Sequence, residues 1–184
     1  MIDAASASAT LGRLRGRLIV SCQPVVGSPL DRTEFVVALA QAVAGAGAAG
    51  LRIEGVARVA AVCRAVDVPV IGIVKTDLAN SPVRITPHLA DVDALAEAGA
   101  GIIAFDATER IRPVPVAEMV ARIHHHGRIA MADVSTRAEG RAAAAAGADI
   151  VASTLAGYVA GPEPTEPDLA LVADLAADGF AVSM

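Results

Sequence analysis

A chain of 184 residues is long enough for one domain with a sizeable core and too short for two ordinary domains. Apolar residues make up 54% of the sequence but aromatic residues only 2%, so the core must be built from Ala, Val, Ile and Leu. The net charge of −5 and the scarcity of aromatic side chains argue against a nucleic-acid-binding protein, because such proteins need a basic or a stacking surface.

Apolar runs rich in β-branched residues alternate along the chain with segments of helical character. We expect strands at Leu18–Cys22, Gly50–Ile53, Val70–Val74, Gly101–Phe105, Ile129–Asp133, Asp149–Ser153 and Phe180–Met184. Between them we expect helices at Arg32–Gly45, Val56–Val66, Ala90–Ala98, Val116–His125, Thr136–Ala146 and Glu166–Ala177. The glycines expected to form left-handed caps at helix ends are Gly45, Gly99, Gly127, Gly147 and Gly179.

The near-continuous apolar strands indicate a sheet that is covered on both faces and is therefore parallel. Strict alternation of strands and helices predicts an α/β fold, a (β/α)8 TIM-type barrel. It would be a single domain over residues 1–184 that is incomplete at its C-terminus. The alternative is an open doubly wound sheet, but that fold places a Gly-rich nucleotide loop after its first strand. Here the first strand leads into Ser21-Cys22-Gln23-Pro24, which favours the barrel.

The two cysteines, Cys22 and Cys63, match neither a disulfide framework nor a zinc pattern, so we expect reduced thiols in a cytoplasmic protein. The first residues, Met1–Thr10, lack the continuous apolar stretch of a signal peptide. The segment Ala142–Gly161 carries no charge except Asp149. Its glycines and alanines nevertheless indicate a buried helix end, strand and loop rather than a membrane span.

Polar residues stand at the end of almost every predicted strand, which is where barrels hold their active sites. Any one of them alone is more often a solvated loop charge or a local cap, but together they favour a site. An ammonium directly after the apolar run Val70–Val74 is costly to bury, so Lys75 is expected to be paired, functional or both. The strand-end residues are Gln23, Arg52 with Glu54, Lys75 with Asp77, Asp106 with Arg110, Asp133, and Thr154 with Tyr158.

No metal or other cofactor is expected, because the carboxylates are spread over different loops without histidine-ligand spacing. The run His124–His126 lies at a helix end on the rim opposite the candidate site, and adjacent helix residues point in different directions. We interpret this run as a solvated C-terminal cap, where the helix dipole favours positive charge.

Several segments at strand ends match one known family in order and spacing. This chain resembles, over nearly its whole length, the N-acylglucosamine-6-phosphate 2-epimerases, also called N-acetylmannosamine-6-phosphate 2-epimerases. The resemblance implies a barrel of the ribulose-phosphate-binding kind. It also implies interconversion of N-acetylmannosamine 6-phosphate and N-acetylglucosamine 6-phosphate in sialic acid catabolism. The matching segments are LIVSCQ (Leu18–Gln23), GLRIEG (Gly50–Gly55), PVIGIVK (Pro69–Lys75), VRITP (Val83–Pro87), DVDALAEAGAGIIAFDATER (Asp91–Arg110) with Arg112-Pro113, MADVST (Met131–Thr136) with Gly140, and TLAGY (Thr154–Tyr158).

The resemblance also implies roles for single residues. Lys75 falls on the family's catalytic lysine, whereas Glu54 and His88 stand where the family usually has small or uncharged residues. A full member continues with an Ala-Glu-Gly-Arg motif, whose Glu acts in proton transfer, and a Gly-rich phosphate loop. The expected barrel is therefore truncated in or after strand 7, and its unpaired edges favour association, for example as a homodimer. Residues that fall on substrate-binding or cavity-facing positions are Gln23, Arg52, Asp106, Arg110, Asp133, Thr154 and Tyr158.

Such an epimerase removes the C2 hydrogen of an open-chain amino sugar, which the C1 aldehyde acidifies, and returns a proton to the opposite face. Lys75 can act as the base only if its pKa falls well below about 10.4. Desolvation and Arg52 would lower this pKa, while pairing with Asp106 or Asp133 would raise it, so the direction stays open here. Two other readings are a Schiff-base sugar-phosphate aldolase that uses Lys75 and a non-catalytic sugar-phosphate binder. The expected partner is thus an amino-sugar phosphate, with no nucleic acid and no membrane.

Overall fold

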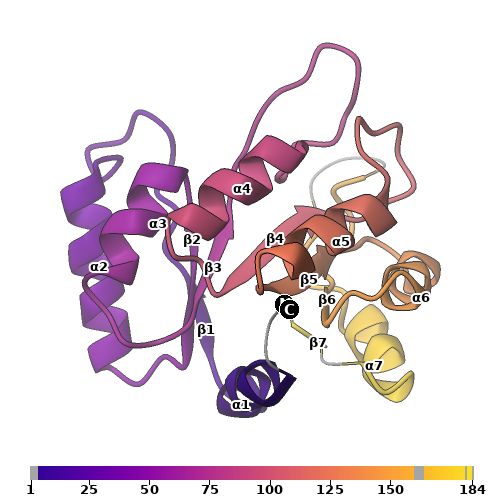
Figure 1. Cartoon of the computed structure of the whole chain (residues 1–184), viewed down its shortest axis with the longest axis horizontal. Helices are drawn as coiled ribbons and strands as arrows, with labels where there is room; N and C mark the ends of the chain where they lie inside the picture. Colours follow the sequence, from indigo (N-terminus) through magenta and orange to yellow (C-terminus); the bar gives the residue numbers. More distant parts are fainter. Residues whose placement is uncertain (1–3, 160–163, 181, 184) are drawn as a thin grey trace.

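The strands form one parallel sheet in the computed structural model, which describes residues 4–159, 164–180 and 182–183 (Figure 1). They lie side by side in chain order from β1 to β7, and every neighbouring pair is parallel. A doubly wound sheet reverses its strand order at a switch point, so the unbroken order rules out that alternative and confirms the parallel α/β prediction. The strands are β1 Ile19–Ser21, β2 Gly50–Glu54, β3 Val70–Ile73, β4 Ile102–Asp106, β5 Ile129–Asp133, β6 Ile150–Ala152 and β7 Val182–Ser183.

The helices that follow the strands were all predicted, most of them to within two residues at each end. The seventh predicted strand, Phe180–Met184, extends over residues 181 and 184, which lie outside the described residues. Helix α7 begins at Leu169 rather than Glu166, because the Asp168 side chain caps it by accepting the Leu171 N–H at 2.9 Å. The helices are α1 Ala4–Leu14, α2 Thr33–Gly45, α3 Val56–Cys63, α4 Leu89–Glu97, α5 Val116–His125, α6 Arg137–Ala145 and α7 Leu169–Ala177.

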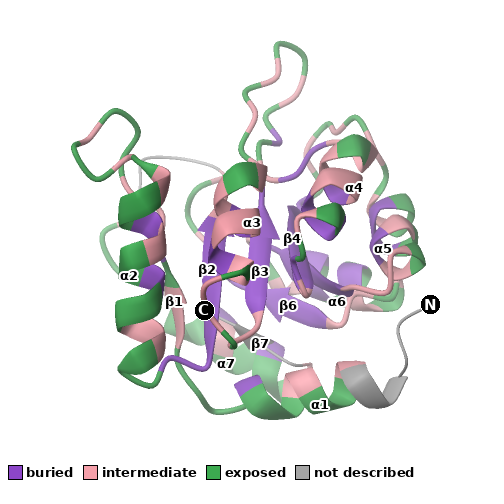
Figure 2. Cartoon of the chain, turned by 60° about the vertical axis from the view of Figure 1, so that its left-hand side comes forward, coloured by how far each residue is buried: buried purple, intermediate pink, exposed green. Residues whose placement is uncertain are grey.

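One sequence-based prediction about local structure was wrong, and one helix was missed. Gly45 is the last residue of α2, and the left-handed turn comes two residues later at Gly47, with φ 100°, because Ala46 still has helical backbone angles. Helix α1 was not predicted at all. It crosses the end of the sheet where the strands begin (Figure 2), and its Leu14 and Leu11 pack against the side chains inside the sheet. Among the described residues, no helix is long and apolar enough to cross a membrane.

Side chains on each strand alternate between two apolar clusters, as the period of a strand requires. On β3, Ile71 and Ile73 belong to an inner cluster that the curved sheet surrounds, while Val70 belongs to the outer cluster with the helices. Gly72 also faces the helices, where a Cβ atom would lie only 3.0 Å from Leu95 and Ala100. Past the ends of the strands, the inward-facing positions hold polar residues. A polar layer therefore lies next to the inner cluster at that end of the sheet. The members of the inner cluster on the other strands are Ile102, Ala104, Ile129, Met131, Ile150 and Ala152.

Candidate functional site

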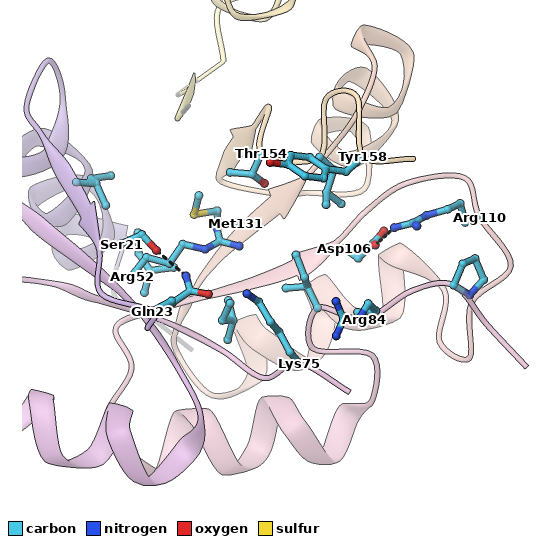
Figure 3. A pocket seen from close by; sticks show the side chains of 16 residues that line it. Ser21, Gln23, Arg52, Lys75, Arg84, Asp106, Arg110, Met131, Thr154 and Tyr158 are labelled. Atoms are coloured by element: carbon cyan, nitrogen blue, oxygen red, sulfur yellow. Dashed lines mark hydrogen bonds and ion pairs between the residues drawn. The ribbon is translucent and has the colours of Figure 1, made fainter. Parts of the chain in front are cut away.

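A pocket of about 600 Å³ opens at the end of the sheet where the strands finish. Its floor is apolar and its walls are polar (Figure 3). Of the residues to which the resemblance gives a role, all except Asp133 line it, whereas the strand-end residues Glu54 and Asp77 do not. The lining residues are Ile19, Ser21, Gln23, Arg52, Ile71, Ile73, Lys75, Pro82, Arg84, Ile85, Asp106, Arg110, Met131, Thr154, Leu155 and Tyr158.

The inward period of the strands explains why these residues meet. Lys75 stands two positions beyond Ile73 of the inner cluster, and Asp106 stands two positions beyond Ala104. On β6 the same step leads from Ala152 to Thr154. Because the strands are parallel, these steps all end at one rim of the sheet. Sequence position alone therefore places the polar layer directly above the apolar one.

Lys75 is the only lysine in the sequence, and it stands at the mouth of this pocket. Within the described residues no carboxylate oxygen lies within 4.0 Å of its ammonium, so neither Asp106 nor Asp133 forms the ion pair that the sequence left open. Loss of water around the ammonium lowers the pKa of Lys75, Glu54 opposes this, and Arg52 and Arg84 add to it. The direction left open by the sequence is therefore downward, and Glu54 is the main opposing carboxylate.

Arg52 is held by two hydrogen bonds to Asp133. Its Nη1 and Nη2 donate to Asp133 Oδ1 and Oδ2 at 3.0 and 2.5 Å. Asp133 has no exposed surface and Arg52 has 8%. Burial works against the charge of Arg52, but the carboxylate outweighs it, so the pKa of Arg52 lies above its usual value. The expectation that Asp133 faces the cavity is thus corrected: Asp133 aims Arg52, whose guanidinium lines the pocket.

Asp106 is surrounded by donors from its own loop. Its Oδ1 accepts from the backbone and hydroxyl of Thr108 at 3.0 and 2.7 Å, and its Oδ2 accepts from Arg110 Nη2 at 2.5 Å. Arg110 also donates from Nε to the Thr108 hydroxyl at 2.9 Å. Arg112 completes the loop by donating to the Asp106 carbonyl at 2.6 Å. This DATERIR segment therefore presents Arg110 to the pocket as a fixed cation.

The remaining candidates differ in how strongly they are held. Gln23 donates to the Ser21 hydroxyl at 2.7 Å. Tyr158 is 57% exposed at the pocket rim. The Thr154 hydroxyl is buried and has no partner among the described residues. Because buried polar groups are nearly always hydrogen-bonded, an unpaired hydroxyl in the pocket wall is suited to bind a polar atom of a ligand.

Arg84 is a pocket residue that the sequence analysis did not single out. It lies on a loop between β3 and α4 and pairs with Asp77, its Nε donating to Oδ1 at 2.5 Å. Arg84 does not stand at the end of a strand. It reaches the pocket because the loop that carries it folds back over the pocket before α4 begins. Its place in the VRITP segment was the one available signal.

The histidine run lies at the C-terminal end of α5 as predicted, but the prediction that it is solvated was wrong for two of its three side chains. His124 Nε2 lies 2.9 Å from Asp149 Oδ2, and His126 Nε2 lies 2.6 Å from Asp93 Oδ1. Only His125 is exposed. Within the described part of the chain, no group of three His, Cys, Asp or Glu side chains is arranged to hold a metal ion.

Comparison with known proteins gives consistent matches. Residues 36–184 match the family described as "Putative N-acetylmannosamine-6-phosphate epimerase". The chain is 60% identical over 164 residues to the bifunctional enzyme NanE/NanK of Brucella melitensis, covering 89% of this chain and 32% of that protein. It is 58% identical over 167 residues to a protein of Escherichia coli O9:H4 named "Putative N-acetylmannosamine-6-phosphate 2-epimerase", covering 91% of this chain and 73% of that one.

A solved structure is similar as well. It is the N-acetylmannosamine-6-phosphate 2-epimerase of Clostridium perfringens, with a TM-score of 0.89 and 36% sequence identity. The match covers 94% of this chain and 77% of that one. The chain thus spans about a third of the bifunctional relative and about three quarters of the two single-function relatives.

Proposed function

The chain belongs to the N-acetylmannosamine-6-phosphate epimerase family, and from this premise we propose that it interconverts N-acetylmannosamine 6-phosphate and N-acetylglucosamine 6-phosphate. The observation that carries the proposal is that one pocket holds both Lys75 and Arg52. Lys75 has a lowered pKa and no ion-pair partner among the described residues, and Arg52 is fixed by Asp133. The similarity to the Clostridium perfringens enzyme further supports a fold of the (β/α)8 type, in which the described strands are the first seven. Two free cysteines are in keeping with a cytoplasmic enzyme.

The chemistry begins at C2 of the open-chain sugar. The neutral Lys75 amine takes the C2 proton. The C2–H electron pair forms the C1=C2 double bond and the C1 carbonyl pair moves onto O1, which gives an enolate. Arg52, aimed by Asp133, stabilises the negative oxygen that forms. A proton derived from solvent adds to the opposite face of C2, the C1 aldehyde re-forms, and Lys75 releases its proton to solvent, so no atom is gained or lost overall. A lowered pKa matters because only the deprotonated amine can act as the base.

The other pocket residues bind the sugar. Gln23 and the Thr154 hydroxyl supply hydrogen bonds to the hydroxyl and amide groups of the substrate. Arg110, fixed on Asp106, and Arg84 supply positive charge toward the phosphate end. Tyr158 lies exposed at the rim, where it can cover the bound sugar.

The test is a reaction in D₂O. The full-length protein is incubated with N-acetylmannosamine 6-phosphate and followed by NMR. We expect N-acetylglucosamine 6-phosphate that carries deuterium at C2. Borohydride added during turnover should not attach substrate to Lys75; such attachment would indicate a Schiff-base aldolase instead. Binding without C2 exchange or product would contradict the proposal and indicate a non-catalytic binder.

A further inference from the structure

The loop that carries Arg84 enters the sheet between two strands. Strands β3 and β4 pair only through Ile71 with Ile102 and Gly72 with Ile103, whereas β4 and β5 pair along their whole length. Beyond Gly72 the loop segment 84–86 takes the place of β4. There Lys75 pairs with Ile85 in an antiparallel bridge, and the Asp106 N–H donates to the Ile85 carbonyl at 3.0 Å. We call residues 75–86 the β3 arm; Figure 2 shows a loop that projects from this end of the sheet.

Thr86 is the residue at the base of this arm. It has no exposed surface. Its hydroxyl donates to the Ala104 carbonyl of β4 at 2.7 Å and accepts the Val74 N–H at 3.3 Å. Its own N–H donates to the Val74 carbonyl at 2.8 Å. A single side chain therefore joins the splayed ends of β3 and β4.

The backbone of Thr86 is strained at this point. Its φ is 47°, and among the described residues other than glycine it alone has a positive φ. A left-handed backbone is a genuine outlier for a β-branched residue, and residues before a proline, here Pro87, favour an extended backbone. Glycine would relieve the strain, but it would lose the hydroxyl and its two hydrogen bonds to β3 and β4. Strain of this kind is found where the surroundings fix a conformation that function uses.

The residues that Thr86 joins are next to the reacting groups. Val74 precedes Lys75, Ala104 lies one inward step before Asp106, and Ile85 and Arg84 precede Thr86 itself. We propose that Thr86 is a positioning residue of the epimerase, whose hydroxyl wedges β3 from β4 and so fixes Lys75, Arg84 and Asp106 around the pocket. The part of this proposal that concerns turnover rests on the proposed function; the part that concerns Lys75 does not.

The decisive comparison uses variants that separate the hydroxyl from shape and backbone. Thr86→Val keeps the shape and loses the hydroxyl, Thr86→Ser keeps the hydroxyl, and Thr86→Gly relieves the backbone without a hydroxyl. We expect kcat to fall about 100-fold in the Val and Gly variants, the usual effect of misplacing reacting groups by about 1 Å. KM should change far less, and Thr86→Ser should restore most of kcat. Thr76→Val is the matched control, because the Thr76 hydroxyl on the same arm has no hydrogen bond within the described residues.

A second readout needs no activity. In this sequence a ¹³C-labelled lysine gives one side-chain signal, that of Lys75. Its titration reports how far the surrounding charges act on it. These charges are Glu54 and Arg52 of β2, Arg84 of the arm and Asp133 of β5. Thr86 fixes the arm that carries Arg84, whose positive charge lowers the pKa of Lys75, so loosening the arm moves that charge away and raises this pKa. The titration and the low-pH limb of kcat then both move to higher pH in the Val and Gly variants, and neither moves in Thr76→Val.

The outcomes are distinguishable. A wild-type protein without turnover sinks the proposed function but leaves the lysine titration to test the wedge. A folded Thr86→Gly with wild-type kcat and an unshifted Lys75 overturns the wedge, even if Thr86→Val fails to fold. Equal losses of kcat in Thr86→Ser and Thr86→Val would also overturn it, because the hydroxyl would then not be the feature that matters.

Discussion

The two ends of the sheet carry charged residues in different states. Where the strands begin, Asp93 accepts from Arg122 at 2.6 Å and also meets His126, while Asp149 accepts the Ala130 N–H at 2.7 Å and meets His124. Each of these carboxylates has partners on neighbouring elements. Where the strands end, Lys75 has no ion-pair partner and the Thr154 hydroxyl no hydrogen bond within the described residues.

This contrast shows how charged residues of one fold divide between structure and chemistry. At the strand-start end, pairing stabilises the charged forms and lowers the pKa of Asp93 to about 2. At the strand-finish end, the arginines are held by Asp133 and Asp106, and these pairs leave Lys75 without a carboxylate of its own. Partial desolvation, together with the nearby Arg52 and Arg84, lowers the pKa of Lys75, which favours the neutral amine. The presence of charged residues therefore does not distinguish the two ends of the sheet. What distinguishes them is whether each charged residue has a partner of opposite charge.

The largest effect is expected from removing the unpaired amine. Lys75→Ala should lower kcat by about 100- to 10,000-fold, the contribution of a general base, because no other lysine is present in the sequence. Calorimetry should still detect substrate binding, since Arg52, Gln23 and Arg110 remain. Exchange of the C2 hydrogen with solvent deuterium should vanish together with turnover. Exchange at near wild-type rates would mean that another residue is the base.

The buried pair beneath the pocket should show the next largest effect, on stability. Asp133→Asn leaves Arg52 buried without its carboxylate, and breaking such a pair costs about 3–5 kcal/mol of unfolding free energy. Urea denaturation measures this loss. The double variant Arg52→Met with Asp133→Leu should recover most of the stability while remaining inactive. If the single variant loses less than about 1 kcal/mol, the pair resembles the exposed pairs of the other end.

A smaller effect is expected from Glu54, the carboxylate that opposes the lowered pKa of Lys75. It lies on the inward side of β2, opposite Ile73 of β3, and Arg58 Nη1 donates to it at 3.4 Å. Glu54→Gln removes the negative charge and should lower the pKa of Lys75 further, so the low-pH limb of kcat moves to lower pH. The single lysine signal measures the same shift directly. Glu34→Gln is the control, since Glu34 pairs with Arg32 on the exposed side of α2. An upward shift in Glu54→Gln would contradict the assignment.

Much of this arrangement follows from the sequence because it depends on local periods. The step of two residues along each strand predicts that Lys75, Asp106 and Thr154 share a rim, and the structure places them around one pocket. The bond between Arg52 and Asp133 joins residues 81 positions apart, so no local pattern reveals that Asp133 aims Arg52. The roles of these residues in substrate binding stay predictions.

Other features depended on tertiary packing that the sequence does not display. Helix α1 is short, its Ser, Thr and Gly residues offset the helix propensity of its alanines, and the packing of Leu11 and Leu14 on the inner cluster stabilises it. Arg84 reaches the pocket because the β3 arm folds back, and the strained backbone of Thr86 at its base has no sequence signature. The partners of His124 and His126 lie on other elements, so the run looks solvated when it is considered alone.

The smallest effect is expected at the end where the strands begin, and it tests whether pairing there is structural. Asp93→Asn should cost at most about 1 kcal/mol, because Asp93 and Arg122 are partly exposed, and kcat should not change. Arg122, with a smaller share from His126, lowers the pKa of Asp93 to about 2, below its usual value. The stabilisation is therefore complete above about pH 4, the unfolded value, and is lost as the pH falls toward 2. The difference in unfolding free energy between wild type and Asp93→Asn should shrink over that range. Asp67→Asn, whose side chain has no hydrogen bond or ion pair within the described residues, should show no such change. A constant difference down to pH 2 would show that packing rather than charge pairing gives Asp93 its effect.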